Sequence, residues 1–188
     1  GANILATDLE PERAYSSGWV ETAQHAQNKQ QLNLRGICDL AVFDKAVDFR
    51  FLDMNAIDSD LKGQFDFWWS ACALEHLGSS RHGLDFIRNS VDCLKPGGVA
   101  VHTTELNCSS DEYTIDNNAT VLFRKRDMLQ LGQSLAKSGC ELTFNFNLGS
   151  LPLDKYIDLP PYRADQHIKL LFDGYETTSF GIMVRKPL

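Results

Sequence analysis

Short apolar runs in the first half of the chain predict strands, and two of these runs end in acidic residues. The first run ends at Asp8 and the second, which alternates apolar and polar residues, ends at Asp53. Such runs are typical of strands, and the polar stretch over residues 10–36 remains unassigned. The four predicted strands cover residues 3–8, 47–53, 65–70 and 99–104.

Two later segments carry apolar residues at helical spacing. The first covers residues 79–94 and ends at the Lys-Pro-Gly-Gly sequence of residues 95–98, which cannot continue a helix. The second follows Arg124 and ends before Gly139. Its predicted buried face consists of Met128, Leu131 and Leu135. Strands that alternate with helices favour parallel pairing through crossover connections.

The C-terminal part predicts a hairpin. A strand is expected over residues 141–147, and residues 168–172 and 177–185 flank the turn dipeptide Asp173-Gly174. The pattern therefore predicts an α/β fold with a mostly parallel sheet and an antiparallel C-terminal hairpin. Trp68 and Trp69 should point to opposite faces of the sheet and pack in the core on both sides.

Composition narrows the class of protein. A chain of 188 residues with 43% hydrophobic residues can form one domain over residues 1–188. The net charge of -7, without a basic cluster beyond Arg124 to Arg126, argues against nucleic acid as a partner. Five cysteines without a CxxC pair predict neither a disulfide framework nor a thiolate zinc site. We expect a cytoplasmic protein without a membrane partner, since no apolar run reaches spanning length.

The acids at the strand ends are candidate ligand-binding residues. In an open parallel sheet, ligands bind beyond the carboxyl ends of the strands. A carboxylate at the end of one strand can accept hydrogen bonds from both hydroxyls of a ribose, and one on the neighbouring strand can accept from an adenine amino group. The alternative for Asp8 or Asp53 is an ordinary helix cap or loop carboxylate.

Four segments, taken in their order and spacing, point to a known family. They are Ala6 to Leu9, Leu52 to Asn55, Phe65 to Ser70 with Ala73 to Leu77, and Leu94 to Gly98. In these segments the chain resembles the class I S-adenosylmethionine-dependent methyltransferases, particularly the branch that modifies small molecules. The resemblance implies a Rossmann-like three-layer sandwich, S-adenosylmethionine as the cofactor and a small-molecule acceptor.

Carried over by position, the resemblance implies that Asp8 holds the ribose, that Asp53 and Met54 flank the adenine, and that Ser70 with Ala71 lies beside the sulfonium. The implied cofactor-binding residues are Asp8, Leu9, Asp53, Met54, Asn55, Ser70 and Ala71.

The chain departs from the family at one point. The family's first strand and its Gly-x-Gly loop, which holds the methionine end of the cofactor, should precede Asp8 by about 20 residues. We therefore expect an N-terminally truncated domain that lacks the first strand, with impaired activity. A missing central strand should leave apolar surface exposed, which a homodimer could cover.

His76 is the first candidate for the catalytic base. Glu75 is a candidate orienter or substrate ligand, and Glu105 closes the next strand, where substrates commonly bind. The alternative is structural: Glu75 lies at the start of a helix and His76 is partly buried, so the two side chains only cap that helix or pack against the protein. His102 is expected to pack in the core.

Two other functions compete with methyl transfer. A nicotinamide-dependent oxidoreductase also places an acid at the end of its second strand, but no tyrosine here is followed by lysine four residues later. A non-catalytic methyltransferase-like subunit would explain the absent glycine loop.

Overall fold

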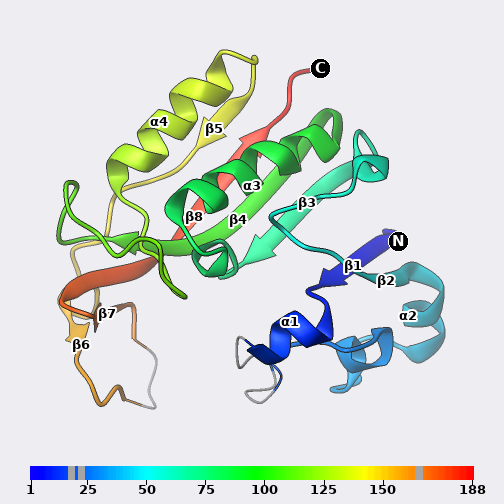
Figure 1. Ribbon diagram of the computed structural model, residues 1–188, viewed down its shortest axis with the longest axis horizontal. Coiled ribbons are helices and arrows are strands. Elements are labelled where there is room, and N and C mark those ends of the chain that lie inside the picture. The colour runs from blue at the N-terminus through cyan, green and yellow to red at the C-terminus, as the bar shows by residue number, and fades with distance from the viewer. Residues whose placement is uncertain (17–19, 21–23, 164–166) are drawn as a thin grey trace. The chain divides into compact units, whose positions relative to one another are not determined.

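The computed structural model describes residues 1–16, 20, 24–163 and 167–188 (Figure 1). Contacts divide the chain into two compact units, Gly1–Asp58 and Ser59–Leu188, which are described separately. One domain over residues 1–188 stays a prediction. No helix among the described residues is long and apolar enough to cross a membrane.

The first unit contains a parallel pair of strands, β1 (Ile4–Asp8) and β2 (Val47–Phe51). Both lie within the predicted strand segments, and Asp8 pairs with Phe51 at their common carboxyl end. The helices are α1 (Pro11–Ser16), η1 (Lys29–Asn33) and α2 (Leu40–Ala46).

Helix α2, which the sequence pattern did not predict, begins after Asp39. The Asp39 carboxylate accepts hydrogen bonds from the amides of Ala41 and Val42, which satisfies donors at the helix start. Phe43 is the buried residue of this short helix. The core of the unit also includes Val47 and Leu52.

The second unit is built on a six-stranded sheet in the order β3-β4-β8-β7-β6, with β5 paired to β8. Strand β4 is parallel to β3, whereas β8 is antiparallel to β4, β5 and β7. Antiparallel pairing therefore extends beyond the predicted hairpin. The strands are β3 (Phe65–Ala71), β4 (Leu94–Asn107), β5 (Glu141–Thr143), β6 (Ile157–Asp158), β7 (Lys169–Phe172) and β8 (Tyr175–Arg185).

The turn between β7 and β8 confirms the hairpin prediction. Asp173 and Gly174 have φ angles of 46° and 84°, so both adopt the left-handed conformation. Two-residue hairpin turns of this kind match the twist of the flanking strands and favour an Asp-Gly pair.

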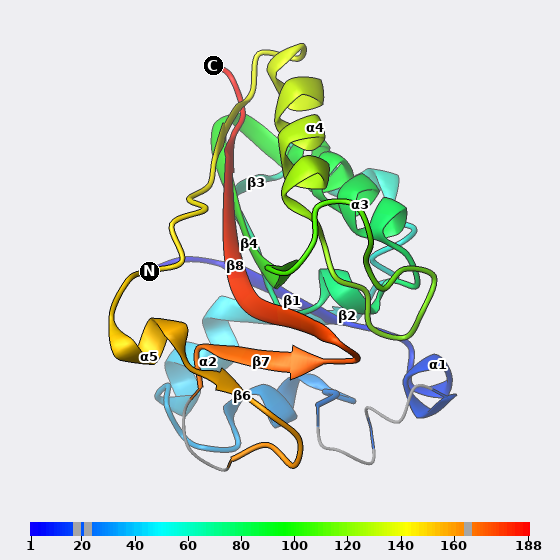
Figure 2. The same cartoon turned by 90° about the vertical axis from the view of Figure 1, so that its left-hand side faces the viewer.

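Two long helices, α3 (Ser80–Cys93) and α4 (Lys125–Ala136), lie on the same face of this sheet (Figure 2). Ser79 caps α3 by accepting a hydrogen bond from the amide of His82. The predicted face of α4 is confirmed, because Met128, Leu131 and Leu135 are all buried. The short helices are η2 (Ser59–Leu61), η3 (Leu74–His76) and α5 (Pro152–Lys155).

The opposite face of the sheet carries exposed apolar side chains. Trp69 pairs with Val101, which pairs with Met183, so the three form one row across β3, β4 and β8. Trp69 is 67% exposed and Phe67 is 55% exposed. The prediction that Trp68 and Trp69 are core residues on both sides is therefore wrong for Trp69, because no described side chain buries it. A homodimer that covers this face stays a prediction.

Candidate functional site

Asp8 lies at the carboxyl end of β1, and backbone amides hold its carboxylate. Oδ1 accepts a hydrogen bond from Leu9 N at 2.8 Å, and Oδ2 accepts one from Ala26 N at 2.8 Å. The buried His25 ring lies beside it, with Nε2 3.7 Å from Oδ1 and 2.6 Å from the Leu9 carbonyl oxygen. A carboxylate offers about four acceptor positions, so Asp8 can still accept further hydrogen bonds.

Asp53 follows β2 at the same end of the strand pair. Its Oδ1 accepts a hydrogen bond from Asn55 N at 2.8 Å, and Oδ2 forms an ion pair with Arg13. The amide of Leu52 donates to the Asp8 carbonyl oxygen at 2.8 Å, which ties the two strand ends together.

The predicted cofactor-binding residues divide between the units. The β1–β2 end gathers Asp8, Leu9, Asp53, Met54 and Asn55, whereas Ser70 and Ala71 end β3 in the second unit. Their roles in cofactor binding stay predictions.

Ser70 is hydrogen-bonded to the core histidine of the second unit. Its Oγ lies 2.8 Å from His102 Nδ1, and Ser90 Oγ lies 3.1 Å from His102 Nε2. Because Ser90 donates its hydroxyl hydrogen to the Ile87 carbonyl oxygen, it accepts from His102 Nε2, and Ser70 donates to Nδ1. Burial lowers the pKa of His102 to about 4, so the ring is neutral. The prediction that His102 packs in the core is confirmed, since none of it is exposed.

Glu75 lies in η3 with only 2% of its surface exposed. Thr104 Oγ1 donates a hydrogen bond to Oε2 at 3.0 Å. Burial raises the pKa of the Glu75 carboxyl, and the charge of Glu105 raises it further, while the hydrogen bonds and His76 act in the opposite direction.

His76 is oriented by the main chain. Its Nδ1 lies 3.0 Å from the carbonyl oxygen of Ala119. Because a carbonyl oxygen only accepts, Nδ1 carries the hydrogen in the neutral ring and Nε2 is the basic nitrogen. This orientation is compatible with the role of a base, which stays a prediction.

Glu105 lies on β4, where its carboxylate bonds to β8. Oε2 accepts a hydrogen bond from Thr177 Oγ1 at 2.9 Å, and Oε1 accepts one from Ser179 Oγ at 3.2 Å. Its role and that of Glu75 in catalysis stay predictions.

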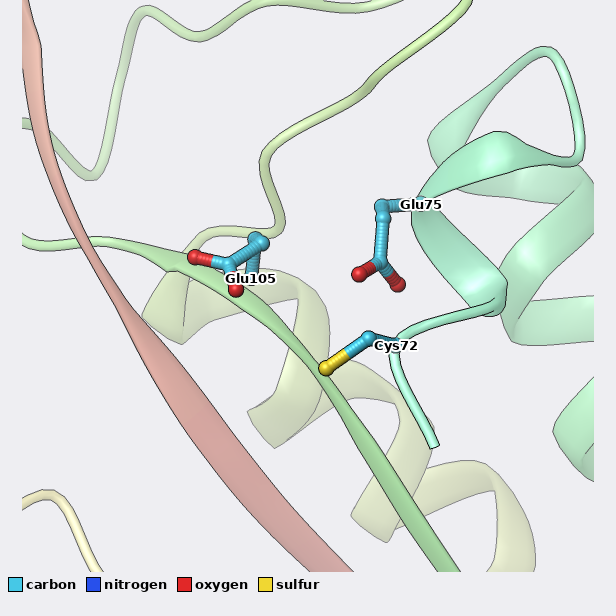
Figure 3. A group of neighbouring side chains, drawn as sticks. All are labelled: Cys72, Glu75 and Glu105. Carbon is cyan, nitrogen blue, oxygen red and sulfur yellow. The ribbon is translucent and has the colours of Figure 1, made fainter. Parts of the chain in front are cut away.

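Sequence reasoning missed the partners of these residues. Cys72 lies next to Glu75 and Glu105, and one ligand atom from each of the three lies within 4.8 Å of the others (Figure 3). Its place directly after a strand, three residues before Glu75, was the available signal. His25 and Ala26 carry no local signal, because the polar stretch over residues 10–36 shows neither strand nor helix periodicity.

No family model and no curated protein matches this chain. Solved structures do match. An S-adenosylmethionine-dependent methyltransferase from Mesorhizobium loti has a TM-score of 0.53 at 12% identity, over 99% of this chain and 91% of that one. The chain has the fold of the class I methyltransferases. The Rossmann-like α/β prediction is confirmed at this level.

Two further structures show how widely the fold is used. A "possible exported protein" from Bordetella parapertussis has a TM-score of 0.52 at 15% identity, and this chain covers 54% of its length. The cyclase SpnF has a TM-score of 0.51 at 15% identity, over the whole of this chain and 76% of that one. The fold therefore does not by itself define the reaction.

Proposed function

We propose that this chain binds S-adenosylmethionine and acts in methyl transfer to a small-molecule acceptor. The observation that carries the proposal is the pair of carboxylates, Asp8 and Asp53, at the adjoining carboxyl ends of two parallel strands. Ligands of open parallel sheets bind at such ends, and the fold is that of methyltransferases.

The two hydroxyl groups of a ribose match the hydrogen-bond acceptors that the Asp8 carboxylate has left. The two amides that hold the carboxylate use one position on each oxygen, and each oxygen keeps a further lone pair for a hydroxyl donor. A neutral amide at this position would keep only one accepting oxygen. Asp8 thus has the chemistry to hold both hydroxyls of the cofactor's ribose.

The adenine would lie against Asp53, Met54 and Asn55. Asp53 Oδ1 is held by the Asn55 amide and can accept from an exocyclic amino group, while the half-buried Met54 offers an apolar contact. Ser70 and Ala71, at the end of β3 in the second unit, are proposed for the sulfonium on the sequence resemblance alone. Bound in this way, S-adenosylmethionine would supply an activated methyl group, so the protein mainly has to align the acceptor and remove its proton.

His76 is the residue that we propose as the proton acceptor. The hydrogen bond from Nδ1 to the Ala119 carbonyl fixes the ring and makes Nε2 the basic nitrogen. Glu105, which is held by two hydroxyls of β8, would orient the acceptor, and the buried Glu75 would act beside His76.

We further propose that the glycine loop for the methionine end of the cofactor is not supplied by these 188 residues, which contain no Gly-x-Gly. In support, β1 pairs only with β2 and β3 only with β4 among the described residues. Turnover by this chain alone would then be impaired. The same observation favours the second candidate, a non-catalytic methyltransferase-like subunit.

Calorimetric titration with S-adenosylhomocysteine, adenosine and NADH separates these functions. We expect the chain to bind S-adenosylhomocysteine and adenosine with similar affinity, because its carboxylates hold the adenosine and not the methionine end. NADH should bind more weakly. Binding of neither adenosine compound would support the non-catalytic subunit, and preferential binding of NADH would support an oxidoreductase.

A further inference from the structure

Three metal-ligating side chains from separate elements converge in the second unit. Cys72 follows β3, Glu75 belongs to η3 and Glu105 belongs to β4. Their ligand atoms lie within 4.8 Å of one another, and Figure 3 shows the side chains grouped around a common point.

The backbone around the cluster is fixed by hydrogen bonds. Cys72 adopts a left-handed conformation with φ of 47°, which is uncommon for a residue with a side chain. Its amide donates to the carbonyl oxygen of Thr103 at 3.1 Å and to Thr103 Oγ1 at 3.0 Å. The Glu75 carbonyl accepts from the amide of Val121 at 2.8 Å. The backbone positions from which the thiol and the buried carboxylate extend are therefore set by the fold.

In the described part of the chain, the side-chain hydrogen bonds that the two carboxylates accept come from neutral hydroxyl groups. Glu75 is 2% exposed, and among the described residues only Thr104 donates a side-chain hydrogen bond to its carboxylate. No described lysine or arginine forms an ion pair with Glu75 or Glu105. Adjacent like charges with one member buried are unfavourable unless a proton or a cation neutralises them.

We propose that Cys72, Glu75 and Glu105 bind a divalent zinc ion. A thiolate with two carboxylates is a ligand set that zinc accepts, and three protein ligands leave one position of a tetrahedral site open. The ligand atoms, which lie within 4.8 Å of one another, would each have to reach a zinc distance of about 2.0 to 2.3 Å. Cys72 is exposed, which gives the ion an entry path. The proposal does not depend on cofactor binding.

Titration of the whole chain with Co²⁺ tests the site. We expect a thiolate-to-cobalt charge-transfer band that saturates at one equivalent and disappears when Zn²⁺ is added. Cys72→Ser should remove the band, and Glu75→Gln and Glu105→Gln should each abolish stoichiometric binding. Glu105→Gln serves as a second carboxylate variant, in case replacement of the buried Glu75 prevents folding.

Matched variants outside the cluster serve as controls. Cys38→Ser removes a half-buried thiol of the first unit, and Glu141→Gln removes an exposed carboxylate on β5. Both should keep the wild-type band. A wild-type chain without the band, or a band that persists in Cys72→Ser, would overturn the zinc site. Neither result bears on the binding of adenosine, which is measured separately.

Discussion

Replacement of Asp8 by Asn is expected to weaken the binding of S-adenosylhomocysteine and of adenosine by about 10- to 100-fold. The substitution removes a charged acceptor while an amide oxygen remains to accept from Leu9 N or Ala26 N. It therefore leaves the end of β1 nearly unchanged in shape. Calorimetric titration of the variant beside the wild type measures the effect.

The matched control is Asp48→Asn, which removes an exposed carboxylate from β2. This variant should bind both compounds as the wild type does. Far-ultraviolet circular dichroism of both variants checks that the fold is kept. Equal affinity of Asp8→Asn and the wild type would remove Asp8 from the cofactor site.

Lowering the pH from about 7.5 to about 5 is expected to reduce the free energy of unfolding by about 2 kcal/mol through His102 alone. Burial lowers the pKa of this histidine from 6.5 to about 4 in the folded chain, so the unfolded chain binds the proton more tightly. The stability is therefore full above about pH 6.5 and is lost as the pH falls towards 4.

Urea denaturation of His102→Gln at the two pH values isolates this contribution from that of the carboxylates. The variant should be less stable than the wild type at neutral pH, because Ser70 and Ser90 lose a partner, but it should lose less stability on acidification. His82→Gln, which removes an exposed histidine of α3, should show the wild-type loss. An identical loss in His102→Gln and the wild type would contradict the neutral buried ring.

The sequence predicted those helices, strands and turns that are specified by residues near one another in the chain, such as a helix cap or a turn dipeptide. Helix α3 was expected from residues 79–94 and begins after its Ser79 cap, and the Asp173-Gly174 turn forms the expected hairpin. Strand β5 is shorter than its predicted segment, and β4 begins at Leu94, five residues before the predicted strand. The Lys-Pro-Gly-Gly sequence of residues 95–98 follows the end of α3, as predicted. It also forms part of β4.

The residues missed by the pattern depend on distant contacts. Trp69 was assigned to the core from its place on an apolar strand, but its exposure depends on what covers that face of the sheet. The Ala26 amide that holds Asp8 is 18 residues away in sequence, and Cys72 meets Glu105 only because β3 and β4 pair. Such contacts follow from tertiary structure and have no periodic signal.

The central claim is that the β1–β2 end binds adenosine, and amide-resolved NMR with added S-adenosylhomocysteine tests it most directly. The amides of Leu9 and Ala26, which hold the Asp8 carboxylate, and that of Asn55, which holds Asp53, should shift in a saturable manner. Saturable shifts that leave these three amides unchanged would contradict the account.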